Sequence, residues 1–392
     1  MLGPDSSRLV VLLASVLKPV DDTRMRGKFA ETLLERPHTQ VHVAGRDAVA
    51  SLRSATAAGH PRIFLHPIFA GSRLSLGRLA AQWRYWRLLR RVAPGLVIVH
   101  APELLPLTVL WQRLGRGRSF VYDVRENYAL NVSTQRVYRG LVRRGLASGL
   151  RWVETRAAHR AAGIILAEAS YRVELPFLGA VPAGRLVVLE NKYHPAPGEA
   201  PLPPPRPAPT APLRLLYSGT ISELNGVGEA IAFAAQMSRA WPAGAHLAIV
   251  GYCQQPALLR KIQEAVAQNP AGLTLVGGAE PVPHARIVAE IGRSHAGLLP
   301  YRPHPSTERC RPTKLFEYLA HGLPIISSPN ALWNDSLRQH GAGLQVDFGR
   351  PVDGPALASA LQHRVFYPAG APADARWSTE GKKLWLFLDS LI

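Results

Sequence analysis

Lys314 and Glu317 are the residues whose types and spacing point most directly to a ligand site. They lie three positions apart in residues 311–328, RPTKLFEYLAHGLPIISS, so on a helix they share one face. The start of a helix presents free N–H groups and partial positive charge, which favour a bound anion. A cation for phosphate and a carboxylate for sugar hydroxyls at such a helix start predict a nucleotide-sugar pocket. An ordinary solvated ion pair is the alternative that the spacing alone favours.

The surrounding residues predict the helix and strand that position this pair. Pro312 suits a first helical turn, and an apolar stripe follows at helical spacing: Leu315, Phe316, Leu319 and Ala320. Gly322 lets the helix end in a left-handed residue, and Pro324 prevents its continuation. Residues 323–326 then predict a short buried strand of a parallel sheet.

The whole stretch resembles the signature P-x-K-x-x-E-Y-L-A-x-G-x-P-[VI]-I-x-S of GT-B glycosyltransferases, in particular the retaining family 4. The resemblance implies an α/β fold of two Rossmann-like parallel-sheet domains that face a cleft. It also implies that Glu317 holds the ribose hydroxyls of a nucleoside-diphosphate sugar and that Lys314 lies near the diphosphate.

The length and a proline-rich segment predict the domain organisation. The 392 residues exceed one usual hydrophobic core. Residues 195–212 are rich in proline and lack apolar periodicity, which predicts an extended linker. We expect an acceptor-side domain at 1–194, a nucleotide-sugar-binding domain at 213–375, and a C-terminal helix at 376–392. That helix opens with Arg376-Trp377-Ser378, which resembles the family's last helix and implies that it crosses back to the first domain.

Strands and helices are expected to alternate on both sides of the linker. The predicted strands of the first half are residues 9–13, 41–44, 96–100, 119–122, 163–167 and 186–189. Those of the second half are residues 213–218, 245–250, 273–276, 296–300, 324–327 and 343–346. The apolar run 9–17 imitates a signal-peptide core, but Lys18-Pro19 follows it and not a small-residue cleavage site, which favours a first strand.

Strand ends in the second half supply further donor-binding candidates. Ser218, Gly219 and Thr220 resemble the family's Y-x-G loop, where glycine admits a close backbone and a hydroxyl donates to phosphate. A plain strand-to-helix turn is the alternative. Asn225 stands where many members have a lysine, and Gly251 resembles the glycine of a strand-ending V-G motif.

The resemblance adds candidates ahead of the signature. His284 and the segment 299–301 resemble the family's sequence at that place. Arg309 occupies the position where many members have the first glutamate of an E-x7-E motif, and Glu308 lies one residue away. The donor-binding residues implied here are Tyr301, Glu308, Arg309, Arg311 and Thr313.

The first half offers candidates at three junctions. His100 is the last residue of the strand predicted at 96–100, where the resemblance implies a His or an acidic residue. We expect it to hydrogen-bond a sugar hydroxyl or to be structural. Asp123 and Glu126 lie in a segment that resembles y-D-x-H-E, with Arg125 in place of the histidine. Arg24, in a K-x-x-x-D-x-R pattern, is the expected phosphate ligand on the acceptor side.

The charge is unevenly distributed. Residues 1–195 carry a net charge of +16, and the remaining residues carry +3. Residues 83–91 and 136–160 alternate arginine with aromatic or aliphatic residues at helical spacing, which is typical of an interfacial helix on anionic lipid. An ordinary core-facing helix with solvated arginines is the alternative. No RNA- or DNA-binding signature accompanies these residues, so nucleic acid is not an expected partner.

Together these features predict a metal-independent glycosyltransferase that moves a sugar from a nucleoside-diphosphate donor to a glycan or lipid-linked acceptor in bacterial cell-envelope or exopolysaccharide synthesis. The resemblance to family 4 implies that the reaction retains the configuration at the anomeric carbon. No Asp-x-Asp or zinc-ligand spacing occurs, and we expect no cofactor beyond the donor. Two cysteines cannot form a disulfide framework, so the expected compartment is the cytoplasm, at the inner face of the membrane. The alternatives are a GT-B-fold epimerase and a non-catalytic partner subunit.

Overall fold

The computed structural model describes residues 9–47, 60–72, 75–134, 140–196, 198–199, 203–305 and 307–391. The chain divides into two compact units. The first comprises Met1–Asn191 and Trp377–Ile392, and the second comprises Lys192–Arg376. The chain passes between the units twice, at neighbouring places, because Tyr193 and Arg376 pair as a parallel bridge within the second unit.

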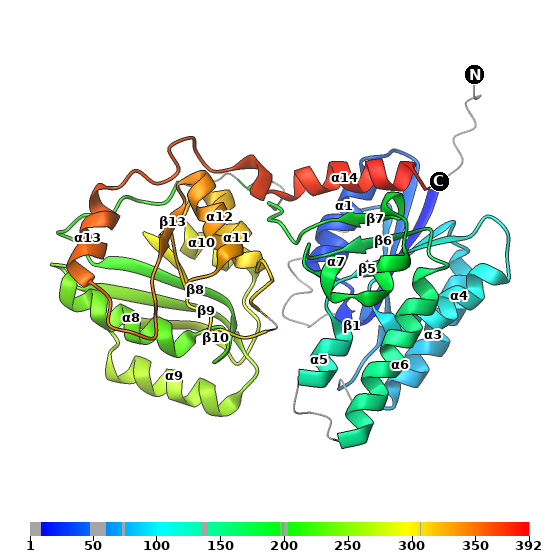
Figure 1. Ribbon diagram of the computed structural model, residues 1–392, viewed down its shortest axis with the longest axis horizontal. Helices are drawn as coiled ribbons and strands as arrows, with labels where there is room; N and C mark the ends of the chain where they lie inside the picture. The colour runs from blue at the N-terminus through cyan, green and yellow to red at the C-terminus, as the bar shows by residue number, and fades with distance from the viewer. Residues whose placement is uncertain are drawn as a thin grey trace. The chain divides into compact units, whose positions relative to one another are not determined.

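The first unit contains a seven-stranded parallel sheet with the order β3-β2-β1-β4-β5-β6-β7. Strands β1, β5, β6 and β7 of this sheet are labelled in Figure 1. Its strands are β1 (Leu9–Pro19), β2 (Thr39–Arg46), β3 (Ile63–Phe69), β4 (Leu96–Val99), β5 (Ser119–Val124), β6 (Gly163–Leu166) and β7 (Leu186–Val188). Strands β4 and β6 are buried at every position, as expected of parallel strands covered on both faces. The strand order reverses between β1 and β4, and sheets of this class bind ligands at the carboxyl ends beside such a reversal.

Helices cover both faces of this sheet. One face packs on α3 (Gly77–Val92), α4 (Leu105–Arg113) and α6 (Gly140–Ala158), through buried residues such as Leu12, Val97, Tyr85 and Trp111. The opposite face packs on a π-helical segment (Thr23–Ala30), α1 (Glu31–Leu34) and α14 (Trp377–Asp389). Successive strand residues alternate between these two cores. In the described part of this unit, the remaining helical segments are α5 (Tyr128–Thr134), α7 (Tyr171–Glu174) and the short 3₁₀ turns Pro102–Leu104, Pro176–Ala180 and Ala183–Arg185.

The second unit contains a six-stranded parallel sheet with the order β10-β9-β8-β11-β12-β13. Its strands are β8 (Leu213–Ile221), β9 (Ala245–Cys253), β10 (Leu273–Gly278), β11 (Ala296–Leu299), β12 (Ile325–Ser327) and β13 (Gly343–Gln345). One face packs on α8 (Val227–Ala240), α9 (Pro256–Gln268) and α13 (Gly354–His363). The other packs on α10 (His284–Ile291), α11 (Thr313–His321) and α12 (Ala331–His340), and a 3₁₀ turn spans Ala373–Ala375. Here the order reverses between β8 and β11.

The predicted fold class is confirmed, because both sheets are parallel and covered by helices. Within the described residues every strand except β3 overlaps a predicted segment. Pro67 lies inside β3 and removes a backbone donor, which an edge strand tolerates, so the sequence pattern did not predict this strand.

The segment boundaries differ in detail from the expected ones. The described part of residues 195–212 contains no helix or strand and lies inside the second unit, whereas the sequence predicted a linker between two domains there. The last helix, α14, belongs to the first unit, where its Leu384 and Leu388 are fully buried.

Two further expectations concern the environment of the chain. In the part of the chain that the structure describes, none of the helices combines the length and apolar composition that spanning a bilayer requires. Cys253 and Cys310 are both free thiols.

Candidate functional site

Three glycines lie side by side near the carboxyl ends of β8, β9 and β10. Gly219 pairs with Gly251, and Gly251 pairs with Gly277. A Cβ atom at Gly251 would lie 1.7 Å from the carbonyl oxygen of Gly219, and one at Gly277 would lie 2.5 Å from that of Gly251. The strands therefore approach one another in a way that only glycine permits, and they leave a surface of bare backbone beside the reversal of strand order.

Helix α11 begins next to this surface with the local structure that its sequence predicts. Pro312 is the N-cap residue in an extended conformation, so it precedes the first turn and does not lie within it as expected. Gly322 ends the helix with φ of 68°, which confirms the predicted left-handed cap. The apolar stripe packs into the core beside Trp333. Packing of that stripe fixes the direction in which Lys314 points.

Lys314 is a buried cation without a hydrogen-bond partner. The residue is 5% exposed, and its Nζ atom makes no hydrogen bond. The ammonium lies 4.5 Å from the ring centre of Tyr217 and 5.2 Å from that of Tyr301, both within cation–π range. Its Cε atom lies 3.5 Å from the position of a Cβ at Gly219, so the lysine reaches the glycine surface.

Burial lowers the pKa of Lys314 to about 8, and the charge of Glu317 offsets this only in part. The ammonium is thus protonated at neutral pH although little in its surroundings compensates for the loss of water. A bound anion would supply that compensation, and a perturbed group of this kind is a functional candidate.

Glu317 lies near Lys314 on α11 and is held by a histidine. His284, the first residue of α10, places Nε2 3.2 Å from Oε1 of Glu317. The backbone oxygen of Glu317 accepts a hydrogen bond from Nδ1 of His321 at 2.8 Å. The Glu317 side chain is 17% exposed, so it is oriented by neighbours and remains open on one side.

The candidates at 218–220 lie within a strand and not in a loop, because β8 continues to Ile221. Ser218 is fully buried, and its Oγ shares a hydrogen bond of 2.9 Å with the Tyr318 hydroxyl. Thr220 is exposed, and its carbonyl accepts hydrogen bonds from the hydroxyl of Tyr217 and from Nδ2 of Asn225. Asn225 therefore shapes the turn after β8.

The remaining candidates of the second unit line the approach to α11. Glu308, Arg309 and Thr313 are exposed, and Arg311 is half-buried. Glu308 also lines a cavity of about 540 Å³ at the carboxyl ends of β11, β12 and β13. Tyr301 lies between this cavity and Lys314, with its ring 5.2 Å from the Trp333 ring. Burial raises the pKa of the Tyr301 hydroxyl well above its usual value.

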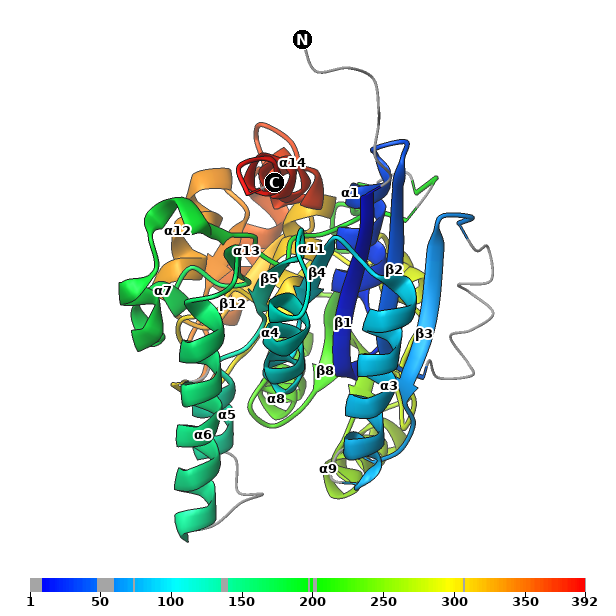
Figure 2. The same ribbon diagram turned by 90° about the vertical axis from the view of Figure 1, so that its right-hand side faces the viewer.

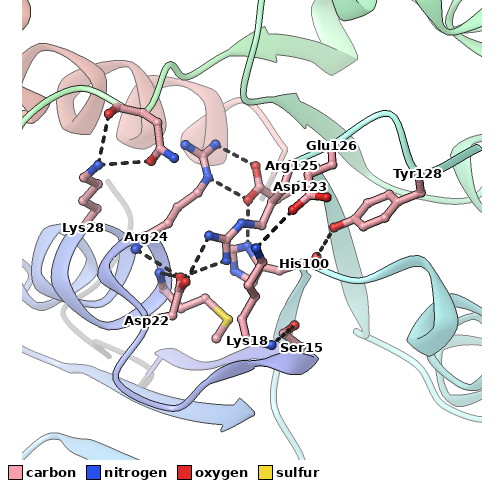
Figure 3. Close-up of polar contacts among 12 residues, drawn as sticks. Ser15, Lys18, Asp22, Arg24, Lys28, His100, Asp123, Arg125, Glu126 and Tyr128 are labelled. Carbon is pink, nitrogen blue, oxygen red and sulfur yellow. Dashed lines mark hydrogen bonds and ion pairs between the residues drawn. The ribbon is translucent and has the colours of Figure 1, made fainter. Parts of the chain in front are cut away.

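In the first unit, three ion pairs join the end of β1 and the residues after it to the end of β5 and the residues after that strand (Figure 3). They are Lys18–Glu126 at 3.1 Å, Asp22–Arg125 at 2.8 Å and Arg24–Asp123 at 2.7 Å. The sequence suggested the residues separately, but not that they pair. Because β1 and β5 flank β4 in the sheet, the pairs bridge the end of β4, where His100 lies.

His100 and Arg24 share the carboxylate of Asp123. His100 Nδ1 lies 2.7 Å from Oδ2, and Arg24 donates from Nε and Nη2 at 2.9 and 2.7 Å. All three side chains are fully buried. Two atoms lack a partner, Nε2 of His100 and Nη1 of Arg24. Arg24 is thus committed chiefly to Asp123, whereas the sequence favoured phosphate as its ligand.

The electrostatics fix the state of the imidazole. Burial opposes ionisation of Asp123, but Arg24 and His100 more than compensate and hold its pKa below the usual range. Burial lowers the pKa of His100, and Asp123 offsets this only in part. An ionised carboxylate only accepts, so the neutral ring carries its proton on Nδ1 and leaves Nε2 as an acceptor. A hydroxyl that donates to Nε2 and accepts from Arg24 would satisfy both orphan atoms.

Sequence reasoning did not assign the roles of His284, Tyr217 or Asp22. Asp22 also caps the π-helical segment, accepting from the backbone N–H groups of Arg24 and Met25. The strand order would have indicated the ion pairs, since the ends of β1 and β5 must lie on either side of β4. Among the described residues, no group of three or more His, Cys, Asp or Glu side chains is arranged to hold a metal ion.

Solved structures with this architecture come from several enzymes. Sucrose-phosphate synthase from Thermosynechococcus elongatus is 16% identical, with a TM-score of 0.63 over 98% of this chain and 99% of that one. HepE from Anabaena, solved in complex with UDP-glucose, is 14% identical, with a TM-score of 0.61 over 97% and 99%. A putative UDP-N-acetylglucosamine 2-epimerase from Listeria monocytogenes is 11% identical, with a TM-score of 0.64 over 98% and 96%.

No protein-family model and no curated protein sequence matches the chain. The structural likeness nevertheless extends over nearly the full length of this chain and of each neighbour. It confirms the architecture that the 311–328 signature predicted. The chain has the GT-B fold, which it shares with these glycosyltransferases and with the epimerase.

Proposed function

We propose that the protein transfers a sugar from a nucleoside-diphosphate sugar to a hydroxyl acceptor. The observation that carries the proposal is Lys314, a buried ammonium without a hydrogen-bond partner, placed beside Glu317, the start of α11 and the bare backbone of Gly219. The site lies at the reversal of strand order between β8 and β11, where sheets of this class bind ligands. HepE, which shares the fold, was solved with UDP-glucose bound.

In this proposal each group has one task. Lys314 and the N–H groups at the start of α11 stabilise the negative charge that develops on the departing diphosphate. Glu317, oriented by His284, accepts hydrogen bonds from the ribose hydroxyls. His100 accepts a hydrogen bond from a sugar hydroxyl through Nε2. Burial and the charge of Arg24 keep that nitrogen unprotonated, and Asp123 holds the ring proton on Nδ1. The other expected donor-side contacts, at Tyr301, Glu308, Arg309, Arg311 and Thr313, belong to the same proposal, as does Glu126 on the acceptor side.

The reaction is proposed to retain the configuration at the anomeric carbon, because the 311–328 stretch resembles family 4. The bond between that carbon and the diphosphate oxygen breaks, and its electron pair leaves with the diphosphate. The acceptor oxygen bonds to the same face of the sugar and gives its proton to the diphosphate. Positive side chains and backbone N–H groups suffice for this step, so the proposal includes no metal and no further cofactor.

We further propose a glycan or lipid-linked acceptor of the bacterial cell envelope or of an exopolysaccharide, handled at the inner face of the cytoplasmic membrane. The net charge of +16 on residues 1–195 supports this placement, because the inner leaflet is anionic.

A panel of UDP-, GDP- and ADP-sugars tests the donor site. We expect one group of donors to raise the unfolding temperature and to release nucleoside diphosphate slowly. Glu317→Ala should lower the affinity for those donors at least about tenfold, because a hydrogen bond between a hydroxyl and a carboxylate contributes about 1.5–3 kcal/mol. The matched control is Glu264→Ala on the exposed surface of α9, which should leave binding unchanged. If no donor protects the protein and Glu317→Ala has no effect, the proposal fails.

Epimerisation of a nucleotide sugar is the second candidate reaction, because a putative epimerase shares the fold. An epimerase would convert the bound nucleotide sugar to its epimer without an acceptor, which NMR of the sugar detects directly. Donor protection with neither turnover nor epimerisation would instead indicate a non-catalytic partner subunit.

A further inference from the structure

Helices α3, α4 and α6 lie side by side over one face of the first sheet (Figure 2). Their inner sides contribute Tyr85, Leu89, Leu105, Trp111 and Ala158 to the core. Their outer sides together form one continuous surface, which we call the three-helix surface.

The three-helix surface is cationic and almost free of acid. Across the three helices the sequence contains no lysine, no aspartate and a single glutamate, Glu154, which is fully buried and accepts a hydrogen bond from Tyr122. The arginines of these helices whose side chains the structure describes are Arg78, Arg84, Arg87, Arg90, Arg91, Arg113, Arg144, Arg151 and Arg156. Two of these arginines are paired with carboxylates, Arg78 with Glu103 at 2.8 Å and Arg151 with Glu154 at 3.5 Å. The composition of the three helices still leaves a large excess of positive charge, which favours an anionic partner.

Large apolar side chains stand among these arginines. Trp83 on α3 is 59% exposed and Trp152 on α6 is 62% exposed, although tryptophan is mostly buried in soluble proteins. Each carries an arginine over its ring, Arg87 at 4.6 Å and Arg156 at 5.5 Å. The exposed leucines of the same surface and its ends are Leu76, Leu79, Leu110, Leu114 and Leu146.

Two grooves repeat this combination. The groove between α4 and α6 has a volume of about 1010 Å³, and Trp152, Val109, Arg113 and Arg160 are among its lining residues. The groove between β3 and α3 has a volume of about 430 Å³, and its lining includes Trp83 with Arg84, Arg87 and Arg91. Each groove therefore offers an apolar wall beside several guanidinium groups, which suits a molecule with an acidic head and an apolar tail.

We propose that the three-helix surface docks on a bilayer of anionic phospholipid, with Trp83 and Trp152 inserted at headgroup depth and the arginines on the lipid phosphates. The inference rests on the membrane association proposed above and assigns it to one surface. Tryptophan favours the bilayer interface because its ring is amphipathic, and guanidinium binds phosphate with two parallel hydrogen bonds. Single-stranded nucleic acid also binds basic grooves with aromatic side chains for base stacking, so it is the competing partner. Lipid is favoured because exposed leucines accompany the tryptophans and no RNA- or DNA-binding signature occurs in this part of the sequence.

The test is co-sedimentation of the full chain with vesicles of phosphatidylglycerol and phosphatidylcholine. We expect Trp83→Ala with Trp152→Ala to lower the partition coefficient about tenfold through lost interfacial burial. Arg87→Glu with Arg156→Glu should lower it more than about tenfold, because each basic side chain near such a surface contributes about fivefold. Binding should also weaken as sodium chloride rises well above about 0.1 M.

Matched controls come from other surfaces of the same chain. Arg239→Glu with Arg260→Glu makes the same change in net charge on exposed positions of α8 and α9. Leu386→Ala removes a 72% exposed apolar side chain from α14, on the opposite face of the first sheet. Both controls should bind vesicles like the parent, and all variants should show its unfolding temperature.

Three outcomes would overturn the assignment: equal losses in the Arg239/Arg260 control, unchanged binding in both three-helix variants, or equal binding to pure phosphatidylcholine. A fourth outcome would assign the surface to nucleic acid: an RNA homopolymer displaces the protein from vesicles, and the tryptophan variants bind that RNA as well as the parent does. Donor protection is measured on the same proteins. If no donor protects the parent protein, the proposed function is wrong. Vesicle binding tests only the three-helix surface, so the two failures can be told apart.

Discussion

His100 Nδ1 lies 2.7 Å from the same Asp123 oxygen that accepts a hydrogen bond from Nε of Arg24 at 2.9 Å. One buried carboxylate thus holds a neutral imidazole in one tautomer and keeps a guanidinium in place at the end of β4. The arrangement determines which His100 nitrogen is left to meet a ligand. It also makes the stability of the first unit depend on one ionised aspartate.

Asp123→Asn should destabilise the protein by about 3–5 kcal/mol at neutral pH, because it leaves the Arg24 charge buried and unpaired. The pKa of Asp123 is lowered in the folded state, so its contribution is complete above the unfolded value of about 3.9 and is lost as the pH falls through the folded value. Urea unfolding of the parent and of Asp123→Asn should therefore give a constant difference in the free energy of unfolding from pH 7 to about pH 5. The difference should become smaller in stronger acid.

Glu126→Gln is the matched control for that prediction. Its partner Lys18 is 37% exposed, and an exposed ion pair contributes about 0–1 kcal/mol. A loss for Asp123→Asn no larger than that of the control would show that Arg24 finds another partner or water.

Lys314→Met should stabilise the protein and remove donor protection. The substitution takes away an ammonium whose pKa of about 8 reflects unfavourable burial, and it keeps a long apolar side chain between Tyr217 and Tyr301. We expect a gain of about 1–3 kcal/mol at pH 7. Since the folded pKa lies below the unfolded one, the gain should shrink as the pH rises from about 8 to about 10.4, where the unfolded lysine also loses its proton.

Thermal and urea unfolding with and without the donor check this prediction. Lys261→Met, on the exposed side of α9, should change stability by less than about 0.5 kcal/mol and leave donor protection intact. If Lys314→Met stabilises the protein but leaves donor binding unchanged, Lys314 does not bind the diphosphate.

Donor affinity should decrease at alkaline pH. The free protein loses the Lys314 proton above a pKa of about 8, while a bound diphosphate raises that pKa, so binding above pH 8 requires proton uptake. Affinity should then fall up to about tenfold for each pH unit. Isothermal titration in two buffers of different ionisation enthalpy would measure the proton uptake. A pH-independent affinity between pH 7 and pH 9.5 would contradict the prediction.

Gly251→Ala should destabilise the second unit by about 3 kcal/mol or more, because the new Cβ would lie 1.7 Å from the Gly219 oxygen and push β8 and β9 apart. Gly228→Ala is the control: its Cβ meets nothing within 4 Å on α8, so it should stabilise by about 0.5–1 kcal/mol. Urea unfolding of the two variants measures both changes in stability. Gly251→Ala reports the cost of separating two strands, and Gly228→Ala reports helix propensity alone. Equal stability of the two variants would mean that β8 and β9 separate without cost.

Much of the second unit could be predicted because its decisive information is local. The stripe from Leu315 to Ala320, the glycine at 322 and the proline at 324 determine where α11 begins and ends, whatever packs around it. Lys314 and Glu317 share a face for the same reason. The end of β8 was misjudged, because its extension to Ile221 depends on Gly251 in a strand about thirty residues away in the sequence.

The first unit shows what only the tertiary structure decides. The sequence by itself determined the individual strands, the charge excess and the polar residues at strand ends, because these follow from period, composition and spacing. Which of those residues pair depended on the order of strands: β4 inserts between β1 and β5, and this brings Arg24, His100 and Asp123 together from positions up to 99 residues apart. Burial then determined their chemistry, since the state of His100 and the pKa of Lys314 depend on how completely water is excluded, and that depends on every element packed around them.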